Sequence, residues 1–222
     1  IEGDDVNITF EELVISGEST DISCFNANDG AVLITAPSVG EWIYDLYFNG
    51  EPYQSIESIN NEEYFDNLSP GAYSATVTNI NTGCISAEWT IDLVEPAALT
   101  QTHTIQNITC YNDSNGSISI DLNGGNDPYT TTLISLDSEY ELSQNGSTIT
   151  FNDLEPGDYM FYPTDINNCE LEFPEDEVFV TITEPAEMEI SETHSDYTGY
   201  GVSCNGESDG SIDVTVIGGT GV

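Results

Sequence analysis

The chain has 222 residues, of which 41 are acidic and none is lysine or arginine. The formal net charge of −41 excludes nucleic acid and anionic membrane surfaces as favourable partners. The aromatic and aliphatic content is still sufficient for a core, so we expect a folded chain of about two domains rather than a disordered one. No run of about 18 apolar residues occurs, so we expect no membrane insertion.

The first predicted elements surround Cys24, in a segment that recurs twice along the chain. The three copies are SCFNANDGAVLIT from Ser23, TCYNDSNGSISIDLNGG from Thr109 and SCNGESDGSIDVTVIGG from Ser203. Each copy joins a cysteine, a polar turn, a glycine six residues after the cysteine, and a strand. The motifs L-x-P-G-x-Y and E-P-A follow in the first two copies. A period of roughly 90 residues indicates tandem repeats.

These anchors predict the domain boundaries. We expect repeats over 1–96 and 97–185, and the first strands of an incomplete third repeat over 186–222. Because an isolated pair of strands is marginal in water, we expect the sequence to be an internal part of a longer protein.

Within each repeat, the signals are those of short β-strands. SISIDL, YTTTLISL, STITFNDL, DYMFYPT and VFVTITEP in the second repeat are rich in β-branched and aromatic residues and alternate with turn residues. About seven such strands predict an all-β fold of tandem immunoglobulin-like β-sandwiches that form an elongated rod. The Pro-Gly turns before Tyr73 and Tyr159 predict tyrosine corners, whose hydroxyls bond back to nearby backbone.

The polar turns have two interpretations, a hairpin turn or a Ca²⁺ site. Alternating Asp and Asn oxygens near a glycine suit a hard cation, and the candidate ligands are Asn28, Asp29, Asp113, Asn115, Glu207 and Asp209. The hairpin interpretation explains these turns, including their glycines, by the preference of Asn, Asp and Gly for positive φ. Glu95 and Glu184, which precede the linker prolines, could share an ion with these turns. No other cofactor is expected.

Other side chains give no sign of catalysis. His103 and His194 lie in the first strand of their repeats, and we interpret them as strand surface. No Ser-His-Asp order repeats, and no cysteine has a neighbouring base, so we expect no catalytic residue and no enzyme. An aromatic cluster is either part of a core strand or an exposed stacking patch for sugars: Trp42, Tyr44, Tyr47 and Phe48.

The pattern SCNG-x-x-DGSI-x-VTV-x-GG, followed by L-x-x-G-x-Y, TD-x-N-x-C and TEP, resembles the SprB-type repeats of flavobacterial cell-surface adhesins. Residues 203–219 match it closely and residues 109–185 match it well. The first repeat departs from it, because Ala36-Pro37-Ser38-Val39-Gly40 replaces the Gly-Gly turn. The resemblance implies secreted, surface-displayed filaments that act in adhesion and gliding and are exported by the type IX system.

Five cysteines leave two pairings open. One is a disulfide within each repeat, Cys24–Cys84 and Cys110–Cys169. The other is a staple between repeats, Cys24–Cys169, in which Cys84 pairs upstream and Cys110 and Cys204 pair downstream. In a sandwich, the turns that hold Cys24 and Cys110 lie at the opposite end from the turns that hold Cys84 and Cys169. The two ends are about 25 Å apart, whereas a disulfide needs Cα atoms within about 7 Å. This geometry favours the staple.

We therefore expect a structural segment of an extracellular adhesin filament or stalk. Its partners would be neighbouring repeats of the same chain, together with surface glycans or other filaments. The alternative is a carbohydrate-binding or ice-binding module, and an accessory region of a secreted hydrolase is a third possibility.

Overall fold

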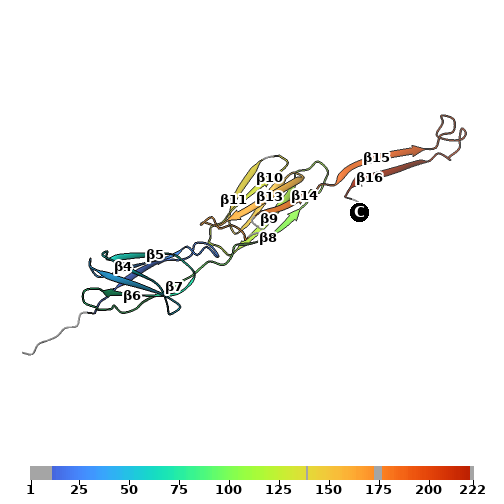
Figure 1. The fold of residues 1–222 in the computed structure, drawn as a ribbon. Helices are drawn as coiled ribbons and strands as arrows, with labels where there is room; N and C mark the ends of the chain where they lie inside the picture. The colour runs from blue at the N-terminus through green and yellow to red at the C-terminus, as the bar shows by residue number, and fades with distance from the viewer. Residues whose placement is uncertain (1–11, 139, 173–176, 221–222) are drawn as a thin grey trace, which may run out of the picture. The chain divides into compact units, whose positions relative to one another are not determined.

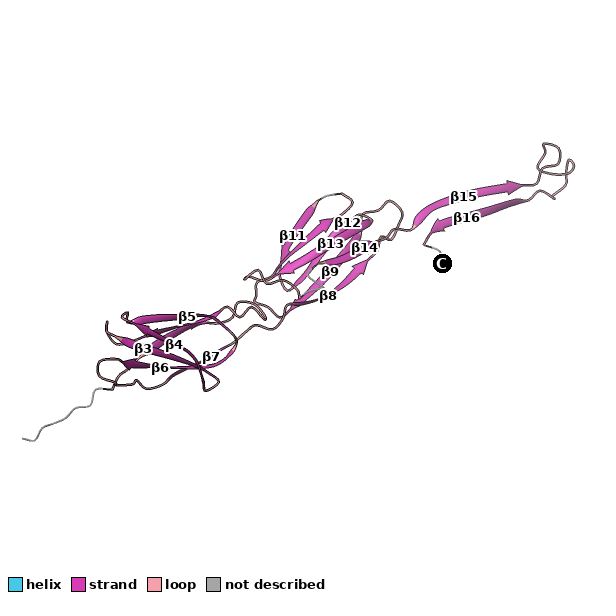
Figure 2. Cartoon of the chain, viewed as in Figure 1, coloured by secondary structure: helices cyan, strands magenta, loops and turns pink. Residues whose placement is uncertain are grey.

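The computed structural model describes residues 12–138, 140–172 and 177–220. These residues form strands, turns and loops, and none of them is helical (Figures 1 and 2). The chain divides into two compact units. Unit 1 runs to Leu99 and also contains Gly124–Asn126, and unit 2 contains Thr100–Asn123 and the chain from Asp127 onward.

Unit 1 is a sandwich of two antiparallel sheets. Its strands, lettered A, B, C, C′, E, F and G in chain order, are β1 (Ser16–Thr20), β2 (Gly30–Thr35), β3 (Trp42–Phe48), β4 (Glu51–Ser58), β5 (Glu62–Leu68), β6 (Gly71–Asn79) and β7 (Trp89–Leu93). One sheet has the order β1-β2-β5 and the other the order β4-β3-β6-β7. This arrangement confirms the predicted immunoglobulin-like all-β fold.

Unit 2 has the same topology. Its strands are β8 (Thr100–Gln106), β9 (Gly116–Asn123), β10 (Thr130–Ser135), β11 (Glu141–Asn145), β12 (Thr148–Leu154), β13 (Gly157–Thr164) and β14 (Val178–Ile182). The sheets have the orders β12-β9-β8 and β11-β10-β13-β14. The same strands pair in the same order in both units, so the two sequence repeats correspond to one fold.

The cores form because apolar residues alternate along the inner strands. In β3, Trp42, Tyr44 and Leu46 are buried, and the residues between them are half-buried. In β9, Ile118 and Ile120 are fully buried between polar neighbours. Period-two alternation places such side chains on one face of a sheet, where the facing sheet covers them. Burying one large aliphatic or aromatic side chain contributes about 1.5–3 kcal/mol.

Each unit also joins its A–B segment to the end of strand G by the same two hydrogen bonds. In unit 1, the Ile22 N–H donates to the Val94 carbonyl at 3.0 Å, and the Val94 N–H donates to Asp21 Oδ1 at 3.0 Å. In unit 2, the corresponding bonds run from Ile108 to Thr183 at 3.0 Å and from Thr183 to Asn107 Oδ1 at 2.9 Å. We call this pair of bonds the A–G clasp.

The last two strands, β15 (Ala186–His194) and β16 (Ile212–Gly219), form an antiparallel hairpin. Its apolar residues Ile212, Val214 and Val216 are 72%, 60% and 53% exposed. They lie eight, ten and twelve residues after Cys204, as Ile118, Ile120 and Leu122 lie after Cys110. Because those counterparts are buried in unit 2, the hairpin has the sequence pattern of strands A and B without a facing sheet.

Thr131 of unit 2 is a buried polar residue whose side chain makes no hydrogen bond to the described residues. It is fully buried in β10, and its hydroxyl has no hydrogen-bond partner among the described residues. A buried hydroxyl without a partner costs about 1–3 kcal/mol. We therefore expect Thr131→Val, which keeps the shape, to raise the free energy of unfolding by about 1 kcal/mol in urea titrations. Thr132→Val is the control, because the Thr132 hydroxyl bonds Ser143 Oγ at 3.1 Å. Equal effects in both variants would contradict the interpretation.

Candidate functional site: the cysteine loops

The A–B loops around Cys24, Cys110 and Cys204 are closed by the same side-chain hydrogen bond. In each loop, the residue before the glycine accepts the N–H of the residue before the cysteine. These bonds are Ser23 N–H to Asp29 Oδ1 at 2.9 Å, Thr109 N–H to Asn115 Oδ1 at 3.1 Å, and Ser203 N–H to Asp209 Oδ1 at 3.0 Å. In the first and second loops, the side chains of the same two residues also bond to each other. The Ser23 hydroxyl donates to Asp29 Oδ2 at 2.5 Å, and the Asn115 amide donates to the Thr109 hydroxyl at 2.6 Å. The Asx residue therefore defines the loop.

The cysteine itself begins a tight turn in all three loops. The cysteine carbonyl accepts the N–H three residues later, at 3.0 Å for Cys24, 3.1 Å for Cys110 and 3.1 Å for Cys204. The third residue of the turn has a positive φ: 61° at Asn26, 63° at Asn112 and 93° at Gly206. Asn and Gly are the residues that adopt this conformation most easily. The Asn or Gly two residues after each cysteine therefore determines the backbone conformation of the turn that begins at that cysteine.

A glutamate after strand G completes the first two loops. Glu95 Oε2 accepts the Asn26 N–H at 2.9 Å, and Glu184 Oε2 accepts the Asn112 N–H at 2.8 Å. We call this contact the Glu latch. It gives the Glu of the E-P-A motif a structural role, because each carboxylate bonds directly to the backbone of its loop.

The glycine that ends each loop has a different role from the one expected. Gly30 and Gly116 do not have a positive φ, so the turn explanation is wrong for them. A Cβ added at Gly116 would lie 3.0 Å from the Leu154 carbonyl and 2.9 Å from the Ile182 side chain, and one at Gly30 would lie 3.0 Å from the Leu68 carbonyl. The glycine is needed because strands B, E and G approach one another closely there.

The candidate Ca²⁺ ligands are distributed within these loops. Asp29, Asn115 and Asp209 close the loops, and the Asn28 side chain donates to the Asn26 carbonyl at 3.0 Å. Asp113 and Glu207 supply the N–H groups of the cysteine turns. Among residues 12–138, 140–172 and 177–220, no three His, Cys, Asp or Glu side chains converge as a metal site. The calcium interpretation therefore stays a prediction from loop composition.

Lowering the pH is expected to weaken the first loop. The Ser23 hydroxyl and then the Ser23 N–H hold the pKa of Asp29 below its ordinary value of 3.8. Since the folded pKa is lower than the unfolded one, the stabilisation is complete above the ordinary value and is lost as the pH falls through the lowered pKa. Asp29→Asn copies Asn115 of the second loop and removes the titration. The difference in free energy of unfolding between the two proteins should shrink from about pH 5 to pH 3. A difference independent of pH would contradict this assignment.

The F–G loops present the other two cysteines on a second shared backbone. The Asn79 N–H donates to the Cys84 carbonyl at 2.9 Å, and the Asp165 N–H donates to the Cys169 carbonyl at 3.1 Å. The residue before each cysteine has a positive φ, 71° at Gly83 and 61° at Asn168. The Asn79 and Asp165 side chains each accept two further N–H groups of their own loop. Both loops are thus built from local hydrogen bonds.

The cysteines differ in chemical state. Cys24 and Cys169 are disulfide-bonded. Cys84, Cys110 and Cys204 are exposed free thiols. The alternative pairs Cys24–Cys84 and Cys110–Cys169 each require one of these free thiols, so the pairing within each repeat is wrong for this structure.

Tyr73 and Tyr159 lie where tyrosine corners are expected. The Tyr73 hydroxyl donates to the Ser69 carbonyl at 3.0 Å, and the Tyr159 hydroxyl donates to the Glu155 carbonyl at 2.9 Å. Both partners lie four residues upstream, across the Pro-Gly turn. Burial raises the pKa of Tyr73 and of Tyr159 above the ordinary value for tyrosine, so both hydroxyls remain donors. They hold the E–F turns in place.

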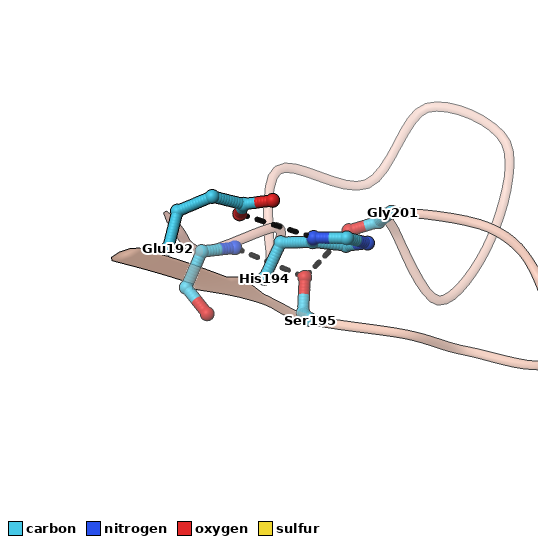
Figure 3. Close-up of polar contacts among 5 residues, drawn as sticks. Glu192, His194, Ser195 and Gly201 are labelled. Carbon is cyan, nitrogen blue, oxygen red and sulfur yellow. Dashed lines mark hydrogen bonds and ion pairs between the residues drawn. The ribbon is translucent and has the colours of Figure 1, made fainter. Parts of the chain in front are cut away.

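Each histidine contacts the side chain two positions before it on the same strand, Gln101 for His103 and Glu192 for His194. His194 Nδ1 lies 3.2 Å from Glu192 Oε2, while the neighbouring Ser195 hydroxyl donates to the Gly201 carbonyl at 2.7 Å. Figure 3 shows both contacts. Ser195 Oγ also accepts the Ser211 N–H at 3.1 Å. The serine therefore holds the hairpin loop instead of bonding to the histidine as a nucleophile would.

The aromatic cluster of unit 1 is divided between core and surface. Trp42 and Tyr44 are buried, as expected for a core strand, while Tyr47 and Phe48 are half-buried. Phe48 stacks on Tyr73 with ring centroids 4.9 Å apart, and Tyr53 of β4 joins them at 6.1 Å from each ring. Sequence reasoning missed Tyr53, which is 50% exposed.

Comparison with known proteins supports the resemblance seen in the sequence. Residues 102–136 and 202–222 match the model of the SprB repeat family. The expected resemblance to SprB-type repeats is therefore confirmed for these two segments, which contain the Cys110 and Cys204 loops. No curated protein sequence matches the chain.

Solved structures with a similar arrangement include three N-terminal domains of the bacteriophage RB49 outer capsid protein Hoc, at 11% identity and a TM-score of 0.46, covering 92% of this chain and 70% of that one. A 1.5-MDa bacterial ice-binding adhesin matches at 13% identity and a TM-score of 0.49, covering 83% and 70%. Two fibronectin type III domains of chicken tenascin match at 9% identity and a TM-score of 0.30, and the match covers 75% of this chain and 97% of that one. These scores carry no argument about function, and the fold class rests on the strand topology. The described residues contain no helix suited to crossing a membrane.

Proposed function

We propose that this chain is a structural, non-enzymatic segment of an extracellular cell-surface adhesin filament. The observation that carries the proposal is the cysteine loop, which occurs three times with the same Asx closure, in a chain whose second and third copies contain segments that match the SprB repeat family. The finer role, adhesion linked to gliding after export by the type IX system, follows from the resemblance alone.

The hairpin β15–β16 is the beginning of a third sandwich in this proposal. Its exposed Ile212, Val214 and Val216 occupy the positions that are buried in strand B of the complete units. Gly218 supports the same assignment. Its φ is 82°, close to the 78° of Gly124. An added Cβ at Gly218 would overlap the Glu187 carbonyl, and one at Gly124 would overlap the Ala98 carbonyl. The remaining strands of a third repeat would cover the hairpin.

A disulfide between Cys24 and Cys169 would staple one repeat to the next. The pairing is supported by the chemical states: both residues are disulfide-bonded, while the other three cysteines are free. The short E-P-A linkers and the Glu latches leave little slack between the end of strand G and the following repeat. Together these features favour a stiff chain of repeats. The uniform negative charge would keep neighbouring filaments apart.

A peptide map of the non-reduced chain tests the staple. We expect one linked pair of peptides that contains Cys24 and Cys169, and unlinked peptides in which Cys84, Cys110 and Cys204 carry the alkyl group. A linked peptide with Cys24 and Cys84 would overturn the staple without affecting the fold.

Surface labelling of the source cells tests the function. An antibody against this chain should label intact cells, and deletion of the segment from the gene should reduce cell attachment. A deletion of the same length in another gene that encodes a surface protein is the control. Labelling only after permeabilisation, or unchanged attachment, would reject the adhesin proposal.

A second candidate function is recognition of a glycan by unit 1. The half-exposed Tyr53 lies beside Phe48 and lines a groove of about 220 Å³ that also contains Tyr47 and Asp45. Aromatic faces beside carboxylates are suited to sugars. Titration with surface glycans, compared between the chain and its Tyr53→Ala variant, tests it, and equal binding by both proteins would reject it.

A further inference from the structure

A three-residue segment of the second repeat is part of unit 1. Gly124–Asn126 follows strand β9 and belongs to unit 1, whereas the residues on either side of it belong to unit 2. The segment is half-buried between the exposed residues Asn123 and Asp127. Its Gly125 N–H donates to the Ala97 carbonyl at 2.7 Å. These three residues are therefore held by unit 1, although the sequence places them in the B–C loop of the second repeat.

Gly124 gives this segment its shape. Its φ is 78° and that of Gly125 is 57°, and Gly218 has a similar φ of 82° in the hairpin. An added Cβ at Gly124 would lie 2.0 Å from the Ala98 carbonyl oxygen. A glycine is needed because the backbone has a positive φ and passes directly over that carbonyl. The close approach holds Asn126, two residues later, in a fixed place.

The Asn126 side chain contacts the cysteine loop of unit 1. Its Nδ2 atom donates to the Ser23 carbonyl at 2.9 Å, and both residues are half-buried. The Ser23 N–H and hydroxyl already bond to Asp29, so the Asn126 bond adds a third fixed point on the residue before Cys24. The Ser23 carbonyl belongs to the planar peptide group that joins Ser23 to Cys24. Asn126 therefore sets the orientation of the backbone that carries the Cys24 side chain.

The B–C and F–G loops of unit 2 lie at the same end of that sandwich. Strands β10 and β13 pair in a register that places Thr130 opposite Thr164. Thr130 lies four residues after Asn126, and Cys169 lies five residues after Thr164. Asp165 Oδ1 accepts the Cys169 N–H at 2.9 Å and holds that cysteine in its loop. A short connection through paired strands thus joins Asn126 to the loop of Cys169.

The pairing of Cys24 with Cys169 needs such guidance. Cys84 follows Cys24 by 60 residues, and Cys169 follows it by 145. The entropic cost of closing a loop grows with the logarithm of its length, so an unfolded chain forms the shorter link about fourfold more often. The longer link becomes the preferred one only when folded contacts bring the two distant cysteines together.

We propose that Asn126 is the positioning residue for the disulfide between Cys24 and Cys169. The inference rests on that pairing, which is part of the proposed function. The Asn126 amide fixes the peptide group before Cys24 and ties it to the segment that leads into unit 2. This anchor raises the effective concentration of the Cys169 sulfur at Cys24 above that of the Cys84 sulfur. Asn126 acts through the Ser23 carbonyl and not through either sulfur.

The disulfide forms by two exchanges with a small-molecule disulfide such as oxidised glutathione. The Cys24 thiolate attacks one glutathione sulfur and releases a glutathione thiolate, which leaves a mixed disulfide on Cys24. The Cys169 thiolate then attacks the Cys24 sulfur and releases the second glutathione thiolate. The released thiolates take up the two protons that the cysteines lose, so two protein thiols are oxidised and one small disulfide is reduced to two thiols. The Asn126 anchor favours the second exchange.

The redox equilibrium of the chain with glutathione tests the proposal. The dilute chain is equilibrated with mixtures of reduced and oxidised glutathione in moderate salt, which screens its negative charges. Thiols are then alkylated, and the linked peptides are quantified by mass spectrometry. The mixture at which half of the Cys24–Cys169 link has formed gives the effective concentration of the two sulfurs. We expect Asn126→Ala and the nearly isosteric Asn126→Asp to lower it about fivefold, the effect of losing one hydrogen bond, and to increase the share of the Cys24–Cys84 link.

Asn123→Ala is the matched control, because Asn123 is exposed and lies three residues before Asn126. It should leave the effective concentration unchanged. A purely structural role of Asn126 would weaken the reduced and the oxidised chain equally, and would therefore not move the equilibrium with glutathione. In concentrated urea, every variant should give the distribution of links that loop length sets.

Two results would overturn the inference. An effective concentration in the Asn126 variants equal to that of the unchanged chain would reject the positioning role and leave the staple intact. A map of the unchanged chain without the Cys24–Cys169 peptide would reject the staple of the proposed function, and the positioning role with it.

Discussion

Replacing Phe161 with alanine is expected to lower the free energy of unfolding of unit 2 by about 3–5 kcal/mol. Phe161 is completely buried in β13, where it pairs with Leu133 of β10 and with Val178 of β14. Removing the ring loses its transfer free energy and leaves a cavity that the two rigid sheets cannot fill. The measurement is the urea-unfolding midpoint of the chain and of the variant.

Phe179→Ala is the control for this substitution. Phe179 lies in the adjacent strand β14, pairs with Met160, and is 62% exposed. The same chemical change at a surface position should alter the free energy of unfolding by less than about 0.5 kcal/mol. Similar losses at both positions would show that Phe161 is not a core residue of unit 2.

Gly116→Ala is expected to destabilise unit 2 by about 1–3 kcal/mol. The added methyl group would lie 3.0 Å from the Leu154 carbonyl and 2.9 Å from the Ile182 Cγ2 atom. The carbonyl belongs to strand E and cannot move without disturbing the pairing of Gly116 with Leu154. Thermal unfolding followed by circular dichroism measures the loss.

Gly201→Ala provides the comparison. A Cβ at Gly201 would meet no atom within 4 Å, and its φ is not positive. This variant should unfold at the same temperature as the unchanged chain. If Gly116→Ala also unfolded at that temperature, the close approach of strands B, E and G would not be the reason for the glycine.

The sequence predicted the parts of the fold that depend on local pattern. Alternating apolar residues such as Ile118 and Ile120 predicted strand B, and the Pro-Gly turn before Tyr159 predicted the position of the tyrosine corner. The repetition of whole segments predicted two sandwiches, because a pattern that occurs twice must fit the same fold twice. Neither inference required knowledge of which distant residues touch.

The features that the sequence did not reveal depend on distant contacts. Glu95 and Asn26 are 69 positions apart, and Glu184 and Asn112 are 72 positions apart, so no local rule connects each glutamate with its loop. The signal in the sequence is the recurrence of Glu before each linker proline, which predicts a role at the facing turns but not the direct hydrogen bond to them. Gly116 was similarly interpreted from its place in a polar turn, although its neighbours come from strands E and G.

The A–G clasp has a consequence for a chain that is pulled from both ends. A polypeptide enters each complete unit at strand A and leaves it after strand G, and the clasp joins these two segments by backbone hydrogen bonds at Ile22–Val94 and Ile108–Thr183. Tension transmitted along the polypeptide would therefore load the clasp bonds together before it reaches the interior of a sandwich. Tension therefore passes from strand A to the end of strand G through the clasp and bypasses the core of each sandwich.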